Sequence, residues 1–142
     1  IVARVLSLSN TDPWAKAGPM IRESLTAGSR FAMMIVTPGA NGAAFQYRTS
    51  TNGSAAPSNS GDQVTTIPRW LRLVRQGNVV SGFISADGQN WTLRGSITLA
   101  MPSAVYVGLA VTSHDDGVVG EARFDGVAIT GPAPDVQPPS IP

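Results

Sequence analysis

Short stretches that force the backbone to turn interrupt this sequence about every ten residues, which is the spacing of strands in antiparallel β-structure. Proline cannot continue a helix, and glycine adopts the positive φ that tight turns require. These stretches include Gly18-Pro19, Pro38-Gly39, Gly77-Asn78, Asp87-Gly88 and Asp125-Gly126. Because no long helix fits between them, the sequence predicts an all-β domain.

The segments between the turns have the patterns of strands. Residues 1–9 and 43–51 alternate between two kinds of side chain, as the two faces of a strand do. Residues 29–37 form an apolar run that predicts a buried strand, and residues 103–114 form the clearest strand pattern of the chain. About eight strands with turns between them predict a β-sandwich or a barrel, and the absence of an internal repeat argues against a propeller.

Residues 66–78 fit two structures. Ile67, Trp70, Leu71 and Val74 have the spacing of one face of a helix, and a helix would also align three arginines as a basic patch. The Gly-Asn pair and the β-branched run that follow favour a hairpin instead. On a strand Arg72 would point away from its neighbours, and the net charge is only +1, so we expect no nucleic-acid binding.

The composition narrows the class of protein further. The chain has 142 residues, enough for one domain with a core of its own, and no cysteine, which excludes disulfides and thiolate zinc sites. No apolar run is long enough to span a bilayer. The chain starts in a strand pattern without a Met or signal peptide, and we expect it to be a piece of a longer protein. Residues 131–142 resemble a Pro-rich interdomain linker.

Several segments, taken in order, resemble a known group of modules. They are WAKAGPMIRES, FQYRTS, WLRLVRQGN, FISADGQNWT, VYVGLAVTSH and ARFDGVAIT. Together they are similar to the concanavalin A-like lectin and glucanase jelly rolls of secreted bacterial multidomain proteins, in particular the group related to the yeast regulation-of-enolase protein. The resemblance covers residues 1–130, and it implies two antiparallel sheets, one of them concave, with the first strands of the module missing.

The resemblance also sets the functional expectation. Modules of this kind accompany glycoside hydrolases and surface repeats, so we expect a non-catalytic carbohydrate-binding or adhesion module that is secreted or on the bacterial cell surface. Its partners would be a polysaccharide and the neighbouring domains of the parent chain. The alternative is a structural spacer or protein-interaction module without a glycan ligand, and a more remote alternative is a polysaccharide hydrolase or lyase.

A mixed polar and aromatic face is the candidate binding site. If the faces of several predicted strands coincide, one concave sheet presents planar donors for hydroxyls and carboxylates together with rings for sugars. The residues of this set are Arg22, Gln46, Arg48, Trp70, Arg72, Tyr106 and His114. Arginine commonly pairs with uronate carboxylates, which points to an acidic polysaccharide. Equally, arginines in a sandwich often cap strand ends, and Trp and Tyr are often core residues.

Catalytic and metal sites have weaker support. His114 is the single histidine, and its neighbour Asp115 would point to the opposite face of a strand, so no catalytic triad is expected. No paired acids resemble those of the glucanases, and we expect no enzymatic activity. Asp115, Asp116 and Glu121 could share a structural calcium ion at one rim, or they could be solvated acids of a turn.

The stretch SADGQNWT, residues 85–92, resembles a shortened aspartate box of the sialidase propellers, but only one copy is present. We therefore interpret Asp87-Gly88 as a hairpin turn and Trp91 as a ring that covers the hairpin end. If that ring belongs to the core, Trp91→Ala should cost about 3–5 kcal/mol of stability, measured as a large fall in melting temperature. Loss of sugar binding at unchanged stability would contradict this interpretation.

Overall fold

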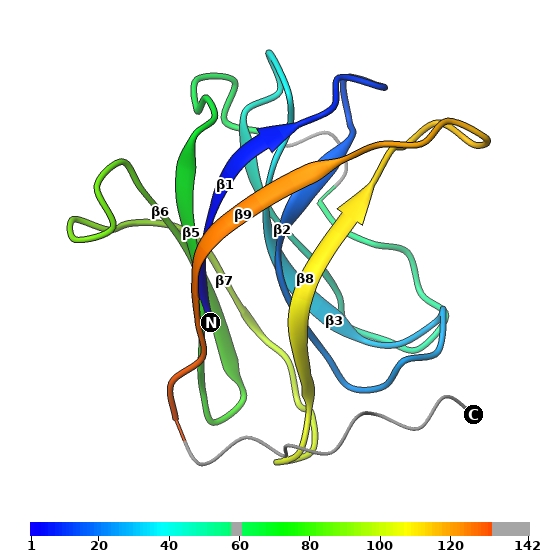
Figure 1. The fold of residues 1–142 in the computed structure, drawn as a ribbon. Coiled ribbons are helices and arrows are strands. Elements are labelled where there is room, and N and C mark those ends of the chain that lie inside the picture. The colour runs from blue at the N-terminus through cyan, green and yellow to red at the C-terminus, as the bar shows by residue number, and fades with distance from the viewer. Residues whose placement is uncertain (58–60, 132–142) are drawn as a thin grey trace.

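The computed structural model describes residues 1–57 and 61–131, and in these ranges it is built of strands alone, in two antiparallel sheets that pack face to face (Figure 1). The strands are β1 (Val2–Leu8), β2 (Lys16–Arg22), β3 (Phe31–Val36), β4 (Ala43–Arg48), β5 (Arg69–Gln76), β6 (Val79–Ser85), β7 (Thr92–Thr98), β8 (Tyr106–Thr112) and β9 (Ala122–Ala128). The five-stranded sheet has the order β7-β6-β5-β1-β9, and the four-stranded sheet has the order β4-β3-β2-β8. The predicted all-β sandwich is confirmed.

The predicted linker, residues 131–142, lies outside the described residues except for Gly131. In the described part of the chain no helix could serve as a membrane span.

The ambiguous segment 66–78 is a strand followed by a tight turn. β5 and β6 are joined by Gly77-Asn78 alone, with Gln76 paired to Val79, and Gly77 has a φ of 58°. The hairpin interpretation is therefore confirmed and the helical one is wrong. Since side chains alternate along β5, Arg72 points to the opposite face from the other two arginines, and the basic patch does not form.

The core lies between the sheets and takes alternate residues from each. From the five-stranded sheet it includes Val5, Leu71, Leu73 and Val80, and from the other sheet it includes Ala17, Ile21, Ala32, Met34, Val36 and Phe45. On β9, Phe124 packs against this core, and the predicted irregularity at Asp125-Gly126 is present as a shift in the pairing of β1 with β9.

Phe45 of β4 reaches across the sandwich to a pair of glycines. Gly82 on β6 and Gly95 on β7 are direct register partners, and a Cβ atom on either one would lie 2.5 Å from the ring of Phe45. Such a distance is far inside van der Waals contact. The two glycines therefore make the space in which the ring sits, and they set how closely the two sheets approach.

A methyl group at this contact should destabilise the fold. We expect Gly82→Ala to lower the free energy of unfolding by about 1–3 kcal/mol, because the ring of Phe45 would have to move within a packed core. Gly39→Ala is the matched control, since nothing lies within 4 Å of a Cβ there and its φ is not positive. Urea unfolding followed by tryptophan fluorescence measures both, and equal stability of the two variants would contradict the packing argument.

Candidate ligand-binding face

The predicted ligand-binding residues do not share one face. Arg22, Gln46, Arg48 and Tyr106 do lie together, on the outer face of the four-stranded sheet. The register places them in neighbouring positions, with Phe31 at the centre, paired to Arg22 on one side and to Arg48 on the other. The structure thus assembles one part of the predicted set.

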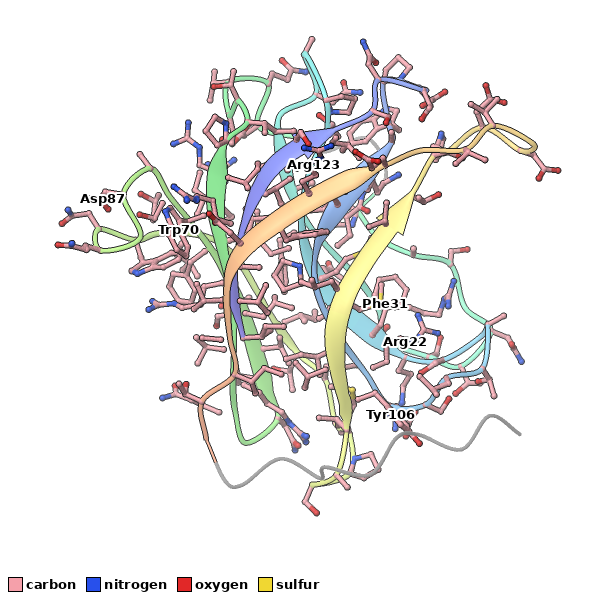
Figure 2. All side chains as sticks on the ribbon, viewed as in Figure 1. Arg22, Phe31, Trp70, Asp87, Tyr106 and Arg123 are labelled. Carbon is pink, nitrogen blue, oxygen red and sulfur yellow. The ribbon has the colours of Figure 1, made fainter. Side chains whose placement is uncertain are left out.

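The remaining residues lie elsewhere. Trp70 and Arg72 are on β5, in the five-stranded sheet, and they point to its outer face. Figure 2 shows Trp70 on one side of the molecule and Arg22, Phe31 and Tyr106 on the other. His114 lies beyond the end of β8. Side chains do alternate along each strand as predicted, but the strands that carry these residues belong to two different sheets, so the residues cannot share one face.

On the four-stranded sheet the arginines are already occupied by the protein itself. Arg22 donates to the carbonyl oxygens of Ser24, at 3.1 Å, and Thr26, at 2.6 Å. Arg48 donates to three more loop carbonyls, at 2.7–3.1 Å, which belong to Ala27, Ser29 and Gly53. Both guanidiniums also lie over the ring of Phe31, 5.7 and 5.1 Å from its centroid. These contacts hold the loops beside the sheet and leave few donors for a ligand.

Arg72, on the other sheet, has a different environment. Its guanidinium carbon lies 4.6 Å from the ring centroid of Phe83 and 4.5 Å from that of Trp91. Its Nε is buried and has no hydrogen-bond partner within residues 1–57 and 61–131. In the same ranges no carboxylate forms an ion pair with it. Two rings therefore hold a cation whose hydrogen-bonding capacity the described protein does not use.

Trp70 completes this face beside Arg72. A Cβ on Gly88 would lie 3.0–3.3 Å from the indole, and Gly126 approaches the ring from β9, so both glycines make room for it. The guanidinium of Arg4 lies 5.2 Å from the ring centroid and is paired with Asp125 through Nε, at 2.6 Å, and a second nitrogen. The hydrogen bonds from Arg4 lower the pKa of the Asp125 carboxyl.

We call Trp70, Arg72, Phe83 and Trp91 the arginine–aromatic face. The sequence pattern identified the two residues on β5 as candidates, but it missed Phe83 and assigned Trp91 to the scaffold. The register could have shown the connection, because Phe83 is the direct partner of Arg72 across the β5–β6 hairpin. Trp91 is half-buried on this outer face and lies outside the core, so the large core-type cost of Trp91→Ala is no longer expected.

The loop that presents Trp91 is held by Asp87. One carboxylate oxygen accepts from the backbone N–H groups of Gln89, at 2.9 Å, and Asn90, at 2.8 Å, and from the Ser85 hydroxyl, at 2.9 Å. The other oxygen accepts from the Asn90 side chain at 2.7 Å. Gly88 has a φ of 75°, which confirms the predicted turn. Because this single acid organises the loop, it fixes where the ring of Trp91 can lie.

The predicted calcium ligands are not assembled. Asp115, Asp116 and Glu121 lie in the stretch between β8 and β9, and in the described part of the chain no three acids, histidines or cysteines are grouped to hold a metal ion. Glu121 accepts instead from Nε of Arg123 at 3.1 Å. His114, at a φ of 55°, has its Nδ1 3.0 Å from Oδ1 of Asp12.

Comparisons with protein-family models, with curated proteins and with solved structures found no match to this chain. The resemblance to the concanavalin A-like modules therefore stays a prediction from the sequence.

The loop around Asp87 should make stability depend on pH in a defined direction. Hydrogen bonds from the backbone N–H groups of Asn90 and Gln89 hold the pKa of the Asp87 carboxyl far below its ordinary value of 3.8. Hydrogen bonds from the side chains of Asn90 and Ser85 lower this pKa further, with a smaller effect. A lowered folded-state pKa adds stability above the unfolded-state pKa, and this stability is lost as the pH falls. We expect the stability advantage over Asp87→Asn to be full at neutral pH and to shrink below about pH 4.

Urea unfolding across a pH series measures this difference. Asp116→Asn, at an exposed aspartate outside the loop, is the control variant. An advantage of the native chain over Asp87→Asn that stays constant from neutral to acid pH would contradict the role of the carboxylate.

Proposed function

We propose that this domain is a non-catalytic carbohydrate-binding module of a secreted or cell-surface bacterial protein, and that the glycan contacts the arginine–aromatic face. The observation that carries the proposal is the guanidinium of Arg72, which lies over two aromatic rings while its buried Nε has no partner among the described residues. The concanavalin A-like jelly-roll type and the multidomain context belong to the same proposal, and they rest on the sequence resemblance.

The chemistry of Arg72 favours an acidic sugar. An arginine presents its donors in a planar fork that matches the two oxygens of a carboxylate, and such bonds are stronger than those between neutral groups. No nitrogen of Arg72 donates a hydrogen bond within residues 1–57 and 61–131, so a ligand carboxylate that reached the accessible part of the guanidinium would meet donors that the described protein does not already use. The carboxylate of a uronic acid residue supplies such an acceptor in a polysaccharide.

The surroundings suit a sugar chain in two further ways. Trp70, Phe83 and Trp91 give flat apolar surfaces of the kind that pyranose rings stack against, and Leu93, which is 54% exposed, extends the apolar area along β7. Arg4 is paired with Asp125, whereas Arg72 has no carboxylate partner within residues 1–57 and 61–131. The rings of Phe83 and Trp91 already lie against Arg72 without a ligand, which reduces the ordering cost of binding.

A rival function has one specific observation in its favour. The four-stranded sheet contains a similar arrangement of Arg22, Phe31 and Arg48, and there the guanidiniums serve only to hold loops. If Arg72 has the same role, the domain is a spacer or a protein-interaction module without a glycan ligand. A hydrolase or lyase is the remote alternative, and an assay for new reducing ends with the same polysaccharides would detect it.

Binding to uronate polymers separates the first two functions. We expect the domain to bind polygalacturonate or alginate more tightly than a neutral glucan in affinity electrophoresis. Arg72→Gln should weaken this binding about tenfold or more, because it removes the charge-assisted bonds. Arg123→Gln is the matched control, since Arg123 is an exposed arginine on the same sheet, remote from the two rings, with its own acidic partner.

Arg48→Gln tests an arginine whose donors are already used by loop carbonyls. Because Arg48 donates to three loop carbonyls, its replacement should lower the melting temperature and leave the polysaccharide affinity unchanged. If the native domain binds no uronate polymer, or if Arg72→Gln lowers stability without changing affinity, the spacer function is supported and the glycan proposal is wrong.

A further inference from the structure

A groove lies in the outer face of the four-stranded sheet, over β2, β3 and β8. Its volume is about 190 Å³. Most of its lining is apolar, and a lysine and a threonine stand at one end. The side chains that matter here are Lys16, Met20, Met33, Ile35, Ala110 and Thr112.

Small residues between longer ones make this groove. Side chains alternate along β2, so Lys16, Gly18 and Met20 share the outer face. Gly18 in the middle pairs with Ala110 of β8, and neither has a side chain large enough to fill the space. Met20, paired with Met33, stands on one side of this row, and Lys16 stands on the other. The two ends are four residues apart, about 13 Å along an extended strand.

The places where the chain leaves the described ranges are not at this groove. Ile1 precedes β1 and Gly131 follows β9, and these strands are antiparallel neighbours, so both residues lie at one end of the sandwich. Lys16 pairs with Thr112, the last residue of β8, at the opposite end (Figure 1). On either side of residues 58–60 the chain is hydrogen-bonded to the outer edge of β4, two strands away from β8.

The ammonium of Lys16 has spare hydrogen-bonding capacity. Its Nζ donates to the carbonyl of Trp14 at 2.8 Å and lies 5.5 Å from the centroid of that ring. In the described part of the chain it forms no ion pair. The carboxylate of Asp12 is held by the backbone N–H of Trp14, at 2.6 Å, and lies 3.0 Å from Nδ1 of His114. Burial lowers the pKa of Lys16, and the charge of Asp12 offsets only part of this effect.

We propose that the groove binds a small carboxylic acid with an apolar body, whose carboxylate pairs with Lys16 and whose body lies against Met20 and Met33. An ammonium has three donors, and an anion at the rim would meet the two that remain. The volume lies below the range of about 300–1,000 Å³ that is usual for drug-sized molecules, so the acid is small. The thioethers make favourable contacts with aromatic rings, which favours an aromatic acid.

This site is independent of the proposed glycan site. The arginine–aromatic face lies on the outer face of the five-stranded sheet, and the groove lies on the outer face of the four-stranded sheet. A result against either proposal therefore leaves the other intact.

Titration with benzoate, followed by NMR, tests the groove. We expect saturable shifts at Met20, Met33 and Ala110, with a dissociation constant on the order of 1 mM, because the groove is small. Benzamide has nearly the same shape without the charge, and it should bind about fivefold more weakly. Lys16→Gln should weaken benzoate about fivefold and leave benzamide unchanged, since it removes the charge. Arg123→Gln, at an exposed arginine of the other sheet, is the control and should change neither.

Lys16 is the single lysine of the chain, so its own titration can be followed. Reductive methylation with ¹³C-formaldehyde keeps the charge of an amine and labels only Lys16 and the amino group of Ile1. Benzoate should raise the pKa of the methylated Lys16, because a carboxylate partner favours the charged form. The signal of Ile1, at the other end of the sandwich, is the internal control and should keep its pKa.

Ala110→Leu fills the groove and should abolish binding of both benzoate and benzamide. Ala128→Leu is the matched control, since Ala128 is an exposed alanine of β9. The melting temperature verifies that both variants are folded. The proposal is overturned if about 10 mM benzoate gives no saturable shift, or if Lys16→Gln and Ala110→Leu leave its binding unchanged. Shifts at the groove that depend on protein concentration alone would assign it to a second copy of the chain, and would overturn the proposal too.

Discussion

The ring of Phe45 fills the space that side chains at Gly82 and Gly95 would occupy, and the packing of the two sheets depends on this exchange. β4 contributes the ring, and β6 and β7 contribute the glycines that leave space for it, so the contact joins β4, at one edge of its sheet, to β6 and the edge strand β7 of the other sheet. Met34 also approaches the Gly82 position, which links the central strand β3 to the same place. With this side of the sandwich closed, the alternate residues of the inner strands meet at the spacing that a dense core requires.

The opposite side of the sandwich is organised differently. Its last strands are β8 and β9, where aliphatic side chains such as Leu109 and Val127 are exposed. Of these two strands, β9 has charges and a bulge, while β8 has neither. This difference between the two sides follows from where Phe45 and the two glycines stand in the sequence.

Most of the fold could be predicted, and much of the site could not. Turn pairs such as Gly77-Asn78 and the alternation around Tyr47 were sufficient to place strands, since both signals act over a few residues. Alternation also showed correctly that Arg48 shares a face with Gln46, and Trp70 with Arg72. It could not show that these two faces belong to different sheets, because sheet membership depends on pairing between segments that are far apart in the chain.

By itself the sequence determined that this chain is an all-β sandwich, where its turns fall and which residues share a face of each strand, because these properties depend on near neighbours. Only the tertiary structure decided which arginines are occupied. Arg22 and Arg48 fold against loop carbonyls, whereas Arg72 lies over Phe83 and Trp91, with its buried Nε unpartnered among the described residues. All three guanidiniums lie over aromatic rings, and the difference between them arises from long-range packing, which brings carbonyl acceptors to Arg22 and Arg48 but none from the described residues to the buried Nε of Arg72.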